Sequence, residues 1–125
     1  MENPIPALSR PSRPPKLQTI GILMLISGVL NVMAGLGIVT GFALSVVLIC
    51  CIPLAALPLA LGVFEVIYGL RLVGSGEEPV QRDTLQTVAI LEIASILGSN
   101  LVSFIAGIIN LVLLSDTEVV AYFKK

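Results

Sequence analysis

The feature that most constrains this chain is a run of 48 residues, 17–64, that contains no charged side chain. Apolar runs of about 18 residues or more are typical of helices that cross a membrane. Over all 125 residues only 12% are charged, whereas about 25% of an average soluble domain is charged. We therefore predict an all-α, polytopic protein of the cell (inner or plasma) membrane, surrounded by the lipid bilayer.

The composition argues against several classes of function. The sequence has no histidine, which is the commonest metal ligand and general base. The two cysteines, Cys50 and Cys51, are adjacent in an apolar stretch and are expected to be small buried side chains. A net charge of −1 offers no basic surface for nucleic acid. We therefore expect no enzymatic activity, no cofactor, no metal site and no nucleic-acid partner.

The first 16 residues are expected to form a disordered, proline-rich, basic tail. They hold five of the eight prolines and three basic residues, and proline at this density prevents a helix. The apolar run that follows, residues 17–39, is longer than the core of a signal peptide, which has about 7–15 residues. We predict that it is a retained transmembrane helix, followed by a turn at residues 40–42.

Small residues recur every seven positions in this first helix and again in a second, expected over residues 53–73. The six positions are Gly21, Gly28, Gly35, Ala55, Gly62 and Gly69. Apolar side chains gain little by contact with one another in lipid, so close backbone approach at small residues drives helices together. We predict that the two stripes pack against each other, and Gly37 and Gly41 add a GxxxG pair.

The place of residues 43–52 stays open at this point. One helix over residues 43–73 would be about 46 Å long, more than the hydrocarbon core of about 30 Å. Pro53 and Pro58 are expected to start or kink the second helix. Residues 43–52 then belong to the first helix, to the second helix or to a re-entrant segment.

The second half of the chain begins with a polar loop, residues 74–83, in which Pro79 is expected to start the next helix. Residues 84–115 contain a single charged residue, Glu92. As one helix they would be about 48 Å long, whereas a break near residues 98–100 gives two short helices. Residues 17–115 are thus expected to form the transmembrane domain, and residues 116–125 a short cytoplasmic tail at the membrane interface.

The distribution of basic residues arbitrates between three and four crossings. With four helices, all seven lie on one side; with three, the two terminal lysines move to the other. The seven are Arg10, Arg13, Lys16, Arg71, Arg82, Lys124 and Lys125. Cytoplasmic loops carry an excess of Lys and Arg. We therefore predict four transmembrane helices arranged as two hairpins, with both termini cytoplasmic.

Three segments resemble small bacterial four-helix membrane proteins for which no activity is established. The segments are GILMLISGVLN at residues 21–31, LGVFEVIYGLRLV at residues 61–73 and INLVLLSDTEVVAYF at residues 109–123. The resemblance covers most of residues 20–125. It implies the four-helix architecture and implies nothing about catalysis.

Two carboxylates lie inside the apolar segments. Glu65 precedes the end of the second helix by eight residues, and Glu92 follows residue 84 by eight, so both are expected about 12 Å from the same side of the membrane. An ionisable residue in the bilayer normally faces protein or water. The polar residues expected to hydrogen-bond with the pair are Ser27, Asn31, Tyr68, Ser95 and Asn110.

Three interpretations of this pair compete. Each Glu could be protonated or hydrogen-bonded and fix helix packing, the pair could bind a proton or cation, or one Glu could meet a cation of a partner protein. The leading hypothesis is a non-enzymatic subunit that assembles with itself or within a larger membrane complex. The alternative is a small proton- or cation-coupled transporter or channel that uses Glu65 and Glu92.

Overall fold

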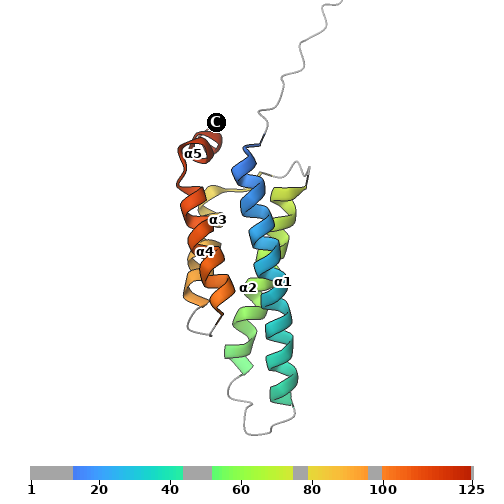
Figure 1. Cartoon of the computed structure of the whole chain (residues 1–125). Coiled ribbons are helices and arrows are strands. Elements are labelled where there is room, and N and C mark those ends of the chain that lie inside the picture. Colours follow the sequence, from blue (N-terminus) through green and yellow to red (C-terminus); the bar gives the residue numbers. More distant parts are fainter. Residues whose placement is uncertain (1–12, 44–51, 75–78, 96–99, 125) are drawn as a thin grey trace, which may run out of the picture.

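The computed structural model describes residues 13–43, 52–74, 79–95 and 100–124, and this part of the chain is all α-helical, without strands. It contains five helices, coloured along the chain in Figure 1. Their bounds are α1 Pro15–Ala43, α2 Ile52–Val73, α3 Arg82–Ala94, α4 Leu101–Leu114 and α5 Thr117–Phe123. The predicted all-α fold is confirmed.

The helices form a long hairpin and a short one, with α5 across the end. Helix α1 packs along α2 and α3 along α4, and the second hairpin docks on α1 through α4. Helices α3 and α4 have 13 and 14 residues, so each is about 20 Å long. Figure 1 shows that they cover one part of the α1–α2 hairpin and leave its far end uncovered.

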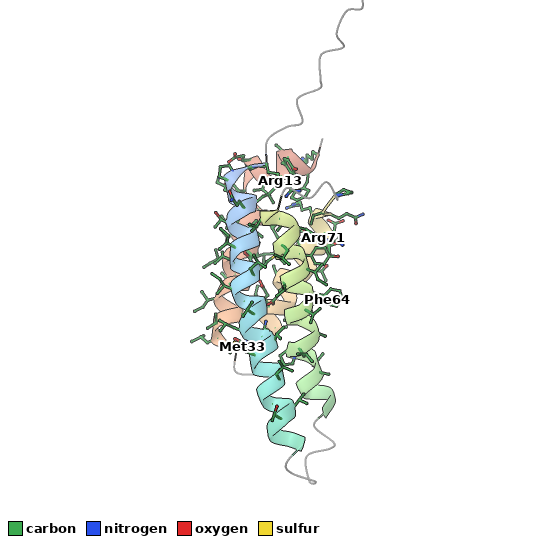
Figure 2. The ribbon with its side chains drawn as sticks, turned by 90° about the vertical axis from the view of Figure 1, so that its right-hand side faces the viewer. Arg13, Met33, Phe64 and Arg71 are labelled. Carbon is green, nitrogen blue, oxygen red and sulfur yellow. The ribbon has the colours of Figure 1, made fainter. Side chains whose placement is uncertain are left out.

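Two described helices are long and apolar enough to cross a membrane: residues 15–41 in α1 and residues 56–73 in α2. Helices α4 and α5 together pass the same test but bend by 71° at the break between them, which gives up to three spans. Many large apolar side chains of α1 and α2 are exposed, among them Met33 and Phe64, both marked in Figure 2. These properties are those of a protein surrounded by lipid.

Several helix ends differ from the expected ones. The turn predicted at residues 40–42 is wrong, because α1 continues to Ala43 and the Thr40 hydroxyl donates to the Leu36 carbonyl inside the helix. Helix α3 begins at Arg82 and not at Pro79. Helix α2 begins at Ile52, while the rest of the open question about residues 43–52 lies outside the described residues.

The short helices are fixed at their ends by caps. Asn100 is the N-cap of α4, and its side-chain oxygen accepts from the backbone N–H of Ser103. Asp116 caps α5 by accepting from the backbone N–H of Glu118. A cap of this kind satisfies one of the free N–H groups at a helix start.

The α1–α2 interface is built on glycine. A Cβ atom added at Gly28 would lie 2.8 Å from the Gly62 carbonyl oxygen, and one at Gly69 would lie 2.8 Å from the Gly21 carbonyl oxygen. At Gly35 it would lie 3.0 Å from the Leu59 Cβ. A side chain at these positions would therefore force the two backbones apart. The side chain of Ala55, the sixth small residue, lies outside the described residues.

The charged residues gather at one end of the bundle. The Arg13 guanidinium donates to the carbonyls of Arg71, Leu72 and Gly74 at the end of α2, and Figure 2 shows Arg13 and Arg71 at this end. Arg82 donates to the Leu114 carbonyl at the end of α4. Lys16 forms an ion pair of 2.7 Å with Asp116. The described start of the chain, its described end and the outer ends of both hairpins thus meet at one level.

Candidate functional site: a buried polar network between the hairpins

Six polar side chains are buried among the helices, each at most 1% exposed. They are Ser27, Asn31, Glu65, Glu92, Ser103 and Asn110. Burial of polar groups costs free energy unless they are hydrogen-bonded, and burial of a charge costs more. Four helices contribute to the set, so the network lies where the two hairpins meet.

Asn31 is the centre of the network. Its Nδ2 donates to both oxygens of the Glu65 carboxyl group, at 3.1 and 2.9 Å. Its Oδ1 accepts from the Ser103 hydroxyl at 3.0 Å and from the Nδ2 of Asn100. Acceptance from two donors on one side fixes the orientation of the amide, so the Nδ2 group must face Glu65.

A second contact joins α1 to α4 through two hydroxyl groups. The Oγ atoms of Ser27 and Ser103 are 2.9 Å apart. Either hydroxyl group can be the donor in this contact. The second hairpin is therefore held on the first by hydrogen bonds as well as by packing.

The other carboxyl group, Glu92, lies in the α3–α4 hairpin. Its Oε2 accepts from the Nδ2 of Asn110 at 2.9 Å. Its Oε1 and the Oδ1 of Asn110 are buried without a hydrogen-bond partner in the described part of the chain. Gly107 lets the helices approach here, since an added Cβ would lie 2.7 Å from the Glu92 Cβ. Buried acceptor atoms without a donor are unusual in a protein.

The two carboxyl groups interact with each other across the hairpins. All five basic residues in the described part of the chain are at least partly exposed, and no ion pair of that part reaches Glu65 or Glu92. Glu65 is eight residues from the end of α2 and Glu92 ten from the start of α3, or about 12 and 15 Å along the helices. The pair is therefore deep in the bundle, and no basic residue of the described ranges forms an ion pair with it.

The predicted site residues divide in two. Glu65, Glu92, Asn31 and Asn110 all lie in this network. Tyr68 is half-buried outside it, with the Arg71 guanidinium 5.6 Å from its ring centre, an arrangement typical of a cation–π contact.

Ser103 and Asn100 belong to the network but were not among the predicted site residues. A signal for Ser103 exists in the sequence. Ser103, Gly107 and Asn110 are spaced by four and three residues, which places them on one face of a helix. Asn100 had been considered only as part of the break between two helices.

The comparisons with known proteins give no family. The sequence matches no model of a protein family, and searches of curated proteins and of solved structures find no match either.

Proposed function

We propose that this chain is a non-enzymatic membrane protein whose buried carboxyl pair binds and releases a proton, as in a small proton- or cation-coupled transporter or channel. The observation that supports it most is the meeting of Glu65 and Glu92 in the interior, where no ion pair joins them to a basic residue of the described part of the chain. Intramembrane carboxyl groups are costly and are typical of ion and proton pathways. A purely structural role does not require two acids, because hydrogen-bonded amide and hydroxyl groups fix helix packing at a lower cost of burial.

The proposal includes the topology of the chain in the membrane. We place the charged end of the bundle, with Arg13, Lys16 and Arg82, at the cytoplasmic surface, as the positive-inside rule favours. The described ends of the chain are then cytoplasmic, and α1 and α2 cross the bilayer. Helices α3 and α4 enter from the same side as the second hairpin of the predicted four-helix arrangement.

The experiment that tests this function is proton flux into liposomes that contain the purified protein. We expect wild-type protein to dissipate an imposed pH gradient faster than empty liposomes. The variants Glu92→Gln and Glu65→Gln are expected to lose this flux at least tenfold, because an amide cannot carry the proton. Glu118→Gln, at an exposed carboxylate of the charged end, is the matched control. Undiminished flux in the double variant Glu65→Gln/Glu92→Gln would contradict the proposal.

A second proposal is an assembling subunit, homo-oligomeric or part of a larger membrane complex. The glycines of the α1–α2 interface are in contact within the chain, but a Cβ added at Gly37 or Gly41 would meet no atom of the described residues within 4 Å. This GxxxG pair lies on the part of α1 beyond Asn31, and such pairs support close helix association in membranes. Native mass spectrometry in mild detergent tests it. A defined oligomer that Gly37→Leu/Gly41→Leu disperses supports assembly, and a lone monomer contradicts it.

A further inference from the structure

We infer that the two buried carboxyl groups have different roles: Glu92 holds the exchangeable proton on Oε1, and Glu65 remains the fixed carboxylate that accepts its hydrogen bond. This inference deepens the proposed function and rests on it, because an exchangeable proton has a role only in a protein that binds and releases one. It goes further because it assigns the proton to one atom of one residue. The evidence is the asymmetry of the hydrogen bonds around the two groups.

Glu65 has the surroundings of a carboxylate. Both of its oxygens accept from Asn31. The amide of Asn31 cannot turn over to present its oxygen instead, because that oxygen accepts from Ser103 and Asn100 on the opposite side. A group whose two oxygens both receive hydrogen bonds is stabilised in its ionised form.

Glu92 has the surroundings of a carboxylic acid. One oxygen accepts from Asn110, and the other, Oε1, has no donor within the described residues. A hydrogen atom on Oε1 changes this atom from an unpaired acceptor into a donor. Since the two carboxyl groups interact, Glu65 provides the acceptor, and the hydrogen bond between acid and carboxylate is of the strong, charge-assisted kind.

Among the described residues, no other titratable group near the pair competes for the proton. The buried polar side chains that α1 and α4 contribute there are hydroxyl and amide groups, from Ser27, Asn31, Ser103 and Asn110. On α2 the neighbouring Tyr68 is half-buried and stacked with Arg71. On α3 the basic residue is Arg82, whose guanidinium is bound to the Leu114 carbonyl at the charged end. Glu65 and Glu92 are therefore the titratable groups that face each other here.

Release of the proton has a defined balance. The O–H bond of Glu92 breaks, the electron pair stays on Oε1, and the proton passes to water as hydronium. The product is a pair of facing carboxylates, which repel each other in apolar surroundings. Release therefore requires water or another cation to reach Glu92, and uptake returns the pair to a single negative charge.

The experiment is infrared spectroscopy of the protein in lipid bilayers, which detects the C=O stretching band of a protonated carboxyl group. We expect wild-type protein to show one such band at neutral pH. Glu92→Gln is expected to abolish it, because Glu65 remains ionised beside Asn31. Glu65→Gln is expected to keep it, because Glu92 stays protonated, and this second variant keeps the test available if the first does not fold.

Three results would overturn the assignment. They are a band that survives Glu92→Gln, a band lost in Glu65→Gln, and the absence of a band in the wild type. The spectrum reports where the proton is held without any transport, so it is independent of flux. A wild type with the expected band but no flux would contradict the proposed function and leave the assignment in place. Flux together with a band that belongs to Glu65 would support the proposed function and contradict the assignment.

Discussion

The two interfaces that hold this molecule together are chemically opposite. Helices α1 and α2 meet at glycine, with backbone atoms of Gly28 and Gly62 so close that neither position has room for a Cβ atom. The α3–α4 hairpin meets α1 through polar contacts, with Ser103 of α4 bonded to Ser27 and Asn31. The first interface depends on shape, and the second adds donors and acceptors that must match.

This difference indicates which interface can change. Backbone packing at glycine offers no titratable group and has a single close-packed arrangement. The polar interface contains two carboxyl groups, so its charge and its hydrogen bonds change when a proton is bound or released. We therefore expect the α1–α2 hairpin to be the fixed part of the molecule and the α3–α4 hairpin the part that responds to protons.

The largest effect is expected from a side chain placed in the glycine interface. In Gly62→Leu the new Cβ would lie 2.7 Å from the Gly28 carbonyl oxygen and 2.8 Å from the backbone nitrogen of Val32, neither of which can move alone. We expect a loss of roughly 3 kcal/mol in the free energy of unfolding, measured by thermal unfolding in detergent. Val63→Leu, at the neighbouring position of α2 that is 46% exposed, is the control, and equal losses in both variants would contradict this account of the interface.

A smaller loss is expected when the centre of the polar network is removed. Asn31→Leu takes the donors from Glu65 and the acceptor from Ser103 and Asn100, leaving buried groups unpaired. We expect the free energy of unfolding to fall by about 2 kcal/mol. Met33→Leu, at a position that is 65% exposed on the same helix, should change it little. If Asn31→Leu were as stable as this control, the network would not hold the hairpins together.

The contact between two serine hydroxyl groups should contribute less. Ser27→Ala, Ser103→Ala and the double variant form a double-mutant cycle across the 2.9 Å contact. We expect a coupling energy of about 0.6 kcal/mol, the average for interhelical hydrogen bonds in a membrane. A coupling energy of zero would mean that the two hydroxyl groups do not interact in the membrane.

The smallest effect is expected at the exposed ion pair of the charged end. The Lys16 ammonium, by its hydrogen bond, holds the pKa of the Asp116 carboxyl group below its ordinary value. A lowered pKa stabilises the folded contact above the ordinary pKa and loses this effect as the pH falls through the lowered value. We expect the amide protection factors of α5, each taken relative to the intrinsic exchange rate at that pH, to fall over that acidic range in wild-type protein and to lose this pH dependence in Asp116→Asn. A profile unchanged by the substitution would show that the pair does not hold α5.

The sequence predicted the first hairpin better than the second. The all-α fold and the long apolar helices follow from uncharged runs that are too long for a soluble domain of this size. The spacing of Gly21, Gly28 and Gly35 led us to pair the first helix with the second, and the structure places these glycines against α2. The end of α1 was predicted too early, with a turn at residues 40–42, whereas the helix continues to Ala43.

The site could be predicted in part. Intramembrane carboxylates are rare enough to stand out by themselves, and counting residues from the helix ends predicts a similar depth for Glu65 and Glu92. The partners depend on how α4 is rotated and how far it extends along α1. Isolated serine and asparagine residues in the sequence do not specify this rotation or this position along α1. For this reason Ser103 and Asn100 were missed as partners of Asn31.

The polar network exists only if the α3–α4 hairpin docks onto the α1–α2 hairpin, and one cross-linking measurement tests this docking directly. In a chain with Cys50 and Cys51 replaced by Ala, the double variant Ser27→Cys/Ser103→Cys places two thiols where the hydroxyl groups are 2.9 Å apart. We predict that mild oxidation in native membranes forms an intramolecular disulfide. Val29→Cys/Ser103→Cys, with Val29 on an exposed face of α1, should stay unlinked. Absence of the Ser27→Cys/Ser103→Cys cross-link, or cross-links only between chains, would contradict the account.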